Sequence, residues 1–188
     1  MPKLTVFNNL TLDGCFAARN GDFSWAHAAG EDPEWKAFVS GNAHSGGVLV
    51  FGRVTYELMA GYWPTAQSAK HDPAVAERIN ALPKVVFSRT LTQAAWNNTR
   101  LISGDLAGEI RRMKQAPGAD LTILGSGSLV GQLTAEGLID EFQVVLVPVV
   151  LGEGRSMFEE LKRRVNLELL RTRVFRNGNV LLCYRPRP

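Results

Sequence analysis

The sequence predicts an α/β fold: a three-layer α/β/α sandwich around a mixed, mostly parallel central sheet, with an antiparallel hairpin at the C-terminus. Short runs rich in β-branched residues alternate with helical stretches along the chain, which is the pattern of a layered α/β domain. Several of these runs are apolar at every position, as in strands buried on both faces. Near the end, Asn177-Gly178 separates two strand-like segments and indicates a hairpin.

The first half of the chain predicts three strands and three helices. Residues 47–51 (GVLVF) form a continuous apolar run, typical of a strand buried on both faces. Asp32 is suited to cap a helix, and Pro33 is suited to its first position, where a missing N–H group costs nothing. Asp72 is suited to cap another helix. The expected elements are strands at 3–8, 47–51 and 84–88 and helices at 32–43, 54–60 and 73–81.

The second half continues the alternation and ends in the hairpin. Pro117-Gly118 stops an amphipathic helix, and a glycine cluster follows the strand expected at 121–125. Pro148 lacks an N–H group, so the long strand around it is expected to lie at an edge or to be bulged there. The expected elements are strands at 121–125, 142–150, 166–175 and 180–185 and helices at 105–115 and 128–136.

Composition limits the classes of protein that fit. The chain has 188 residues, of which 45% are hydrophobic and 21% charged, so we expect one globular domain over residues 1–188 and exclude a disordered chain. The net charge of +3 is too small to imply a polyanionic partner by itself. The last 36 residues carry nine Lys and Arg against four Asp and Glu, which keeps a nucleic-acid-binding module as an alternative.

No signal for export, membrane insertion or metal binding is visible in the sequence. Its N-terminus leads directly into an apolar alternation, and no apolar run approaches the ~18 residues of a membrane span. The two cysteines, Cys15 and Cys183, and the three histidines, His27, His44 and His71, do not have the spacing of metal ligands. We therefore expect a cytoplasmic protein without a metal.

Three strand-to-helix junctions carry residues suited to phosphate. In the first, Gly52 follows a buried strand, and Arg53 and Thr55 open the next helix, whose free backbone N–H groups attract anions. Arg53 could form a charge-assisted contact with a phosphate, and the Thr55 hydroxyl could add a hydrogen bond. A turn glycine beside a solvated arginine is the alternative interpretation.

The other two junctions repeat this pattern. Ser88 and Arg89 follow the next buried strand and could hold a second phosphate, or could simply be the polar end of that strand. Gly125-Ser126-Gly127-Ser128-Leu129 joins a strand to a helix and allows a pyrophosphate to pass close to the backbone, although the full dinucleotide fingerprint is absent. Ligands of open α/β sheets bind at the carboxyl ends of strands, so the three junctions together predict a dinucleotide site.

The ordered set of motifs resembles the dihydrofolate-reductase-like superfamily, in the branch of the reductase domain of bacterial riboflavin biosynthesis. The motifs that carry the resemblance span nearly the whole chain. They are Asn9-Leu10-Thr11-Leu12-Asp13-Gly14, Gly21-Asp22-Phe23-Ser24-Trp25, Gly52-Arg53-Val54-Thr55-Tyr56-Glu57, Val85-Val86-Phe87-Ser88-Arg89-Thr90, Ile123-Leu124-Gly125-Ser126-Gly127-Ser128-Leu129 and Val147-Pro148-Val149-Val150-Leu151-Gly152-Glu153-Gly154. The resemblance implies NADPH as the reductant and a homodimer.

The resemblance also implies roles for the junction residues. Arg53 and Thr55, next to Gly52, would bind NADPH phosphates, and Ser88 and Arg89 would lie at the 2′-phosphate. Residues 125–129 would surround the pyrophosphate and the nicotinamide. The loop from residue 13 to residue 25 would line the substrate, with Trp25 as its binding residue.

Reduction of a C=N or C=O bond also needs a proton donor. Asp32, three residues before Trp35, is the nearest match to the helix carboxylate of folate reductases, although it is equally suited to cap the helix. Asp13 could orient the substrate or close a turn with Gly14, and His27 is a further candidate acid or an exposed loop residue. We therefore predict Asp32 and Asp13 as catalytic residues.

These observations favour an NADPH-dependent oxidoreductase that reduces a small pteridine- or pyrimidine-like heterocycle, similar to the riboflavin-biosynthesis reductase. True dihydrofolate reductase is the alternative enzyme. A non-catalytic nucleotide- or nucleic-acid-binding module is the alternative from another class. Arg53 and Arg89 predict a preference for NADPH over NADH, because they supply positive charge for the additional phosphate.

Overall fold

The computed structural model describes residues 1–27, 32–45 and 47–187. Its strands are β1 (Leu4–Thr11), β2 (Cys15–Ala17), β3 (Val48–Gly52), β4 (Lys84–Phe87), β5 (Thr99–Ile102), β6 (Leu121–Leu124), β7 (Glu141–Val147), β8 (Arg155–Ser156), β9 (Leu167–Val174) and β10 (Val180–Pro186). Eight of them form one sheet, in the order β5-β4-β3-β6-β1-β7-β10-β9. The first six in this order are mutually parallel, and β10 is antiparallel to β7 and β9. The predicted mixed sheet with its C-terminal hairpin is confirmed.

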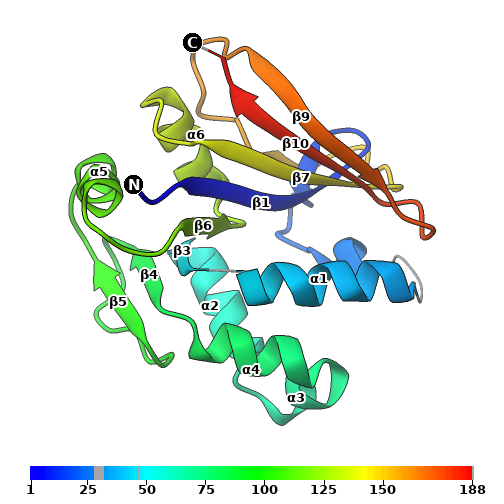
Figure 1. Cartoon of the computed structure of the whole chain (residues 1–188), viewed down its shortest axis with the longest axis horizontal. Coiled ribbons are helices and arrows are strands. Elements are labelled where there is room, and N and C mark those ends of the chain that lie inside the picture. Colours follow the sequence, from blue (N-terminus) through cyan, green and yellow to red (C-terminus); the bar gives the residue numbers. More distant parts are fainter. Residues whose placement is uncertain (28–31, 46, 188) are drawn as a thin grey trace.

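Helices cover both faces of the sheet, which gives the three layers that the sequence predicts (Figure 1). They are α1 (Pro33–Ser45), α2 (Arg53–Tyr62), α3 (Ala66–His71), α4 (Pro73–Ala81), α5 (Leu106–Gln115) and α6 (Gly127–Ala135), with a short 3-10 turn, η1 (Ser24–His27). The helices α1 to α4 lie on one face, and α5 and α6 lie on the other (Figure 1). All of the parallel strands therefore end at one edge, between these two helical layers.

Alternation along the strands divides the core between the two faces. Leu4 and Val6 of β1 point toward α5 and α6, where they join a cluster that contains Ile110 and Leu133. On the opposite face, Phe51 of β3 packs with residues of α2 and α4. In β3 itself, Val50 belongs to the first cluster and Phe51 to the second, so this apolar run is buried on both sides of the sheet.

The structure corrects the ends of two predicted strands: β1 continues to Thr11, and the strand before Pro148 lies inside the sheet, between β1 and β10, without a bulge. β7 ends at Val147 and not at residue 150, because Pro148 has no N–H group with which to continue the ladder. The chain turns there, with the Val149 N–H donating to the Val147 carbonyl at 2.8 Å. Val149 then accepts a hydrogen bond from the Leu12 N–H, also at 2.8 Å, which ties this segment to the end of β1.

Candidate functional site

A cavity of about 1200 Å³ opens at the carboxyl ends of the parallel strands and extends between α1 and the sheet. Every residue predicted to bind the cofactor lines it. These residues are Gly52, Arg53, Thr55, Ser88, Arg89, Gly125, Ser126, Gly127, Ser128 and Leu129. Segments that are separated by more than 70 residues in the sequence therefore meet at one wall.

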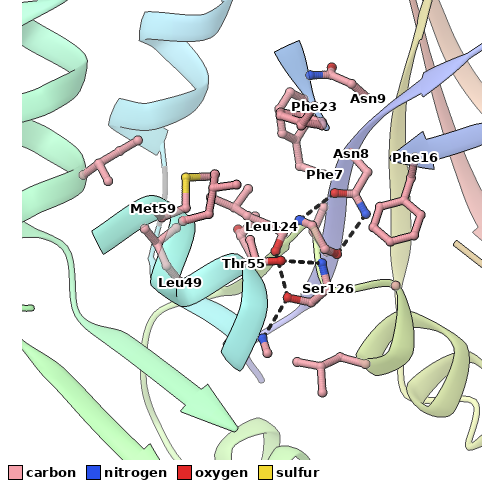
Figure 2. Close-up of a pocket in the computed structure, with 18 of the residues that line it drawn as sticks. Phe7, Asn8, Asn9, Phe16, Phe23, Leu49, Thr55, Met59, Leu124 and Ser126 are labelled. Carbon is pink, nitrogen blue, oxygen red and sulfur yellow. Dashed lines mark hydrogen bonds between the residues drawn. The ribbon is translucent and has the colours of Figure 1, made fainter. Parts of the chain in front are cut away.

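Asn8, in the middle of β1, fixes the backbone of this wall (Figure 2). Its Nδ2 donates to the Gly125 carbonyl at 3.1 Å, and its Oδ1 accepts from the Gly125 N–H at 2.6 Å. The same Nδ2 lies 3.0 Å from the Met157 sulfur. The residue is 6% exposed, so a buried amide holds both backbone polar groups of Gly125, which belong to two consecutive peptide units. Sequence reasoning missed this residue.

Ser126 and Thr55 link the ends of β3, β6 and α2. The Ser126 N–H donates to Thr55 Oγ1 at 3.0 Å, and Ser126 Oγ accepts from the Gly52 N–H at 2.7 Å (Figure 2). Ser126 Oγ also donates to the Leu124 carbonyl at 3.2 Å, so this hydroxyl already has a donor and an acceptor. Ser126 therefore shapes the backbone of the site. The Thr55 hydroxyl only accepts in these contacts, so its proton is available for a hydrogen bond to a ligand.

The glycines of the third junction leave no room for a side chain. Gly125 has φ +59°, and a Cβ atom there would lie 2.7 Å from Thr55 Oγ1. A Cβ atom on Gly127 would lie 2.8 Å from the ring of Phe16. Only glycine fits at these two positions. Without side chains there, a pyrophosphate can approach the backbone N–H groups closely.

Positive charge and free N–H groups gather at this end of the cavity. The N-termini of α2 and α6 both line it, and the first-turn N–H groups of a helix have no partner within the helix. Arg53, Arg89 and Arg155 line it as well. Arg53 forms an exposed ion pair with Glu57 at 2.9 Å, which is weak enough to exchange for a phosphate. These donors fit a ligand with several phosphates.

The Ser88 hydroxyl has a structural task at the second junction. Its Oγ accepts from the backbone N–H groups of Thr90 at 3.1 Å and Leu91 at 2.9 Å, which closes the turn after β4. This turn presents Arg89 at the cavity wall. The arginine therefore supplies the charge, and the serine fixes the segment that carries it.

The cavity deepens into an aromatic and amide-lined region between β1 and α1. Phe7 and Asn9 of β1, Phe23 of the following loop and Trp35 of α1 line it, together with Gln143 of β7. Figure 2 shows Asn9 beside Phe23, on the other side of the strand from the hydrogen bonds between Asn8 and Gly125. Such walls suit a flat ring. The two adjacent asparagines in the second half of β1 were the available signal for this region.

Asp32 does not line the cavity. Its carboxylate caps α1, accepting from the N–H groups of Glu34 at 2.9 Å and Trp35 at 3.3 Å, and it also accepts from Asn177 at 3.1 Å. Burial raises the pKa of this carboxyl group, but the three backbone donors and nearby Arg176 outweigh that effect, so its pKa lies below the ordinary value. The structure thus shows the capping function, and the catalytic function stays a prediction.

Asp13 also lies outside the cavity lining. It accepts from the Thr11 hydroxyl at 2.5 Å and from the N–H groups of Leu151 at 3.3 Å and Gly152 at 2.8 Å. The hydrogen bond from Thr11, assisted by these backbone donors, lowers the pKa of its carboxyl group. Asp13 therefore holds the segment after β7 against the end of β1, and its predicted catalytic function is untested.

Trp25 is buried beneath the aromatic region instead of lining the cavity. It is 6% exposed and packs edge-on against Phe23, with 5.5 Å between ring centroids. Through Phe23 it supports the cavity wall, while its predicted contact with substrate remains untested. The side chain of His27, the further candidate acid, lies outside the described residues.

The described residues contain neither a cluster of metal-ligating side chains nor a membrane-spanning helix. No group of three or more His, Cys, Asp and Glu side chains in them could hold a metal ion. No helix among them is long and apolar enough to cross a membrane.

The sheet order and the cavity at its carboxyl edge define a protein of the dihydrofolate-reductase-like fold. Dihydrofolate reductase from Enterococcus faecalis, solved in complex with NADP(H), superposes with a TM-score of 0.62 at 16% identity, covering 99% of this chain and 97% of that one. A Shewanella sp. PV-4 protein, described as a candidate riboflavin biosynthesis protein, gives a TM-score of 0.75 at 21% identity and covers 99% of both chains.

The chain belongs to the RibD C-terminal domain family, whose pattern matches residues 2–181. This family contains reductases, so the predicted resemblance is confirmed. The Bacillus subtilis protein YyaP, which is uncharacterised, is 31% identical over 175 residues, covering 93% of this chain and 90% of its own. A Thermotoga maritima deaminase and 5-amino-6-(5-phosphoribosylamino)uracil reductase shares the fold, with a TM-score of 0.67 at 13% identity over 99% of this chain and 57% of that one.

Proposed function

We propose that the protein is an NADPH-dependent reductase that acts on a small pyrimidine- or pteridine-like heterocycle. One observation carries the proposal: the ten residues expected to bind the cofactor line a single cavity at the strand ends. Its volume of about 1200 Å³ exceeds the ~300–1,000 Å³ typical of a site for one small ligand. The cavity therefore has room for a dinucleotide and a second molecule.

The phosphate-rich part of the cofactor would lie at the basic end of the cavity. Arg53 and Arg89 would bind phosphates through charge-assisted hydrogen bonds, and the N-terminus of α6 would receive the pyrophosphate beside Gly127. Asn8 would keep the Gly125 peptide fixed while the ligand binds. NADPH would supply the hydride, and the chain would orient the nicotinamide and exclude water.

The substrate would occupy the aromatic region between β1 and α1. Phe7 and Phe23 provide apolar surface for a flat ring, and Asn9 and Gln143 provide polar groups for its edge. A pyrimidine or pteridine combines these two properties. The reaction would resemble that of the riboflavin-biosynthesis reductase, the activity named for the Thermotoga maritima neighbour.

Fluorescence titration with NADPH and NADH tests the cofactor site. We expect micromolar binding of NADPH, weaker binding of NADH, and at least a tenfold loss of NADPH affinity in Arg53→Ala and Arg89→Ala, because each removes a charged contact to phosphate. Arg164→Ala is the matched control, since Arg164 is exposed and does not line the cavity. Unchanged binding in both cavity variants, or no binding of either nucleotide, would contradict the proposal.

Turnover then separates a reductase from a nucleotide-binding module. Pyrimidinones and pteridines are screened for oxidation of NADPH, with NADPH deuterated on one face of C4. A reductase transfers deuterium from one face only, whereas a binding module oxidises no NADPH with any acceptor. A polyanion-binding module would instead show affinity that falls steeply with salt.

A further inference from the structure

Two consecutive asparagines in the second half of β1 differ in their hydrogen bonding. Because side chains alternate along a strand, Asn8 and Asn9 point to opposite faces of the sheet (Figure 2). Asn8 has partners for both of its amide atoms, namely the backbone C=O and N–H groups of Gly125. It is therefore fully explained by its structural role.

Asn9 has no such explanation. Its Oδ1 atom is buried, and it has no hydrogen-bond partner among the residues that the structure describes. Buried polar atoms in native proteins are nearly always paired, because an unpaired acceptor loses its hydrogen bonds to water and gains none in exchange. Asn9 lines the large cavity, so the missing partner can come from a molecule bound there.

The surroundings of Asn9 indicate the shape of that molecule. Phe7 precedes it by two residues on the same face of β1, and Figure 2 shows the side chain of Phe23 next to it. Both phenyl groups line the cavity. Aromatic walls beside a single amide favour a planar ring that stacks on the phenyl groups and presents its polar edge to the amide.

The position of Asn9 also relates that ring to the cofactor. Asn9 follows Asn8, which holds Gly125 in the segment that the resemblance assigns to the pyrophosphate and the nicotinamide. The two asparagines point to opposite faces of the sheet, but both of them and Gly125 line the same cavity. A ring bound to Asn9 would therefore share this cavity with the cofactor, as transfer of hydride requires.

We infer that Asn9 recognises the substrate by pairing its side-chain amide with a lactam edge, the adjacent N–H and C=O groups of a pyrimidine- or pteridine-type ring. A side-chain amide presents one acceptor and one donor side by side, and a lactam presents the complementary pair. The buried Oδ1 would accept from the ring N–H, and Nδ2 would donate to the ring carbonyl. This inference rests on the proposed function and specifies the substrate class for the same site.

Calorimetric titration with two matched pteridines tests the inference. Lumazine carries lactam N–H groups, and 1,3-dimethyllumazine has both of them methylated. In the presence of NADP⁺, we expect the protein to bind lumazine at least tenfold more tightly than the dimethyl compound, because methylation leaves the Asn9 oxygen unpaired. Asn9→Leu and Asn9→Ser should bind the two compounds with affinities that agree within about twofold.

Thermal unfolding of the variants without ligand provides the structural control. Asn9→Leu should keep or raise the unfolding temperature, since it replaces an unpaired buried acceptor by an apolar group. Asn8→Leu should lower it, because it leaves the Gly125 N–H and C=O groups without partners. A lowered unfolding temperature in both Asn9→Leu and Asn9→Ser would assign Asn9 a structural role and overturn the inference.

The NADPH and lumazine titrations together distinguish a failure of this inference from a failure of the proposed function. If the protein fails to bind NADPH, the proposed function fails and the inference fails with it. If NADPH binds but lumazine does not bind at millimolar concentration, or the Asn9 variants keep the preference for lumazine, the inference alone is overturned. Retained NADPH affinity in Asn9→Leu would show that the variant has lost substrate recognition and not the cofactor site.

Discussion

Lys84 shows how a single charged residue is built into the core. It is 1% exposed in β4, and its Nζ donates to the carbonyl groups of Asn80 at 2.9 Å, Leu82 at 2.7 Å and Asn97 at 3.2 Å. The same ammonium group lies 4.4 Å from the centre of the Trp96 ring. It thereby fastens the end of α4 and the segment before β5 to the sheet. No carboxylate compensates its charge in these contacts, so burial lowers the pKa of Lys84 to about 8.

This pKa predicts a rise of stability with pH. Between pH ~8 and ~10.5 the unfolded chain keeps the Lys84 proton and the folded chain has lost it, so the free energy of unfolding increases as pH rises through this window. From pH 7 to pH 10 we expect a gain of about 2–3 kcal/mol from this group. Urea unfolding at both pH values measures it, with Lys84→Met as the reference that lacks the group. An equal pH dependence in the two proteins would contradict the prediction.

Gly125 carries a second residue-level prediction. Gly125→Ala should lower the free energy of unfolding by about 1–3 kcal/mol, because φ is +59° and the new Cβ would lie 2.7 Å from Thr55 Oγ1. The displaced peptide should also weaken NADPH binding. Thermal unfolding and NADPH titration measure the two effects. Gly118→Ala is the control, since a Cβ atom there meets nothing within 4 Å; a similar loss in both variants would refute the steric explanation.

The sequence indicated the residues of the cavity wall where the pattern is local. Arg89 and Gly127, which line the cavity, were singled out from their own junctions, and their binding of a cofactor stays a prediction. Asn8 was missed because its partner, Gly125, is 117 residues away. The sequence could name the residue types at the wall, but it could not pair them across the sheet.

At the level of elements, α1 depends on the cap that Asp32 provides. Asp32→Ala should lower the unfolding temperature by about 2–4 °C, because it removes the acceptor for the N–H groups of Glu34 and Trp35. Asp32→Asn should lower it less, since asparagine still caps the helix although its amide nitrogen cannot accept from the Asn177 N–H.

The same pair of variants tests the predicted proton donor. A general acid works best with a pKa near the working pH, and the pKa of Asp32 is lowered instead. We therefore expect Asp32→Asn to keep most of its turnover in a steady-state assay of NADPH oxidation. A loss of 100-fold or more in kcat with unchanged stability would restore Asp32 as the catalytic acid.

Long and regular elements were predicted more accurately than short or irregular ones. The buried strand β3 and the helix α5 appear within one residue of their expected bounds, because an apolar run and an amphipathic pattern are strong signals. The strands β2 and β8 were not predicted, since two or three residues carry no periodicity, and their pairing joins segments that are far apart in the sequence. β5 contains an exposed Arg100 and lacks the apolar pattern of a buried strand.

At the scale of the whole molecule, the cavity follows from topology. Six parallel strands end at one edge, so their junctions must meet there whatever their separation in the sequence. This rule made it predictable, without any known contact, that the three junctions would line one cavity. The aromatic region between β1 and α1 was not predictable in the same way, because it depends on how far α1 stands from the sheet, which no local pattern specifies.

The outer edge of the sheet leads to the last prediction, the homodimer that the family resemblance implies. β9 is the final strand of the order, and its apolar residues remain uncovered: Leu167, Leu169, Leu170 and Val174 are 37%, 51%, 44% and 70% exposed. An exposed apolar edge strand is an unfavourable surface for a monomer, and pairing with a second copy would bury it.

We therefore expect light scattering after gel filtration to give twice the chain mass of 20.6 kDa for the wild-type protein. The double variant Leu169→Asp and Val174→Asp should give the monomer mass, because two carboxylates cannot be buried at the interface without a large desolvation cost. Leu12→Asp provides the control, as an equally exposed leucine outside β9. A monomeric wild type would refute the dimer, and a dimer that survives the double variant would place its interface elsewhere on the molecule.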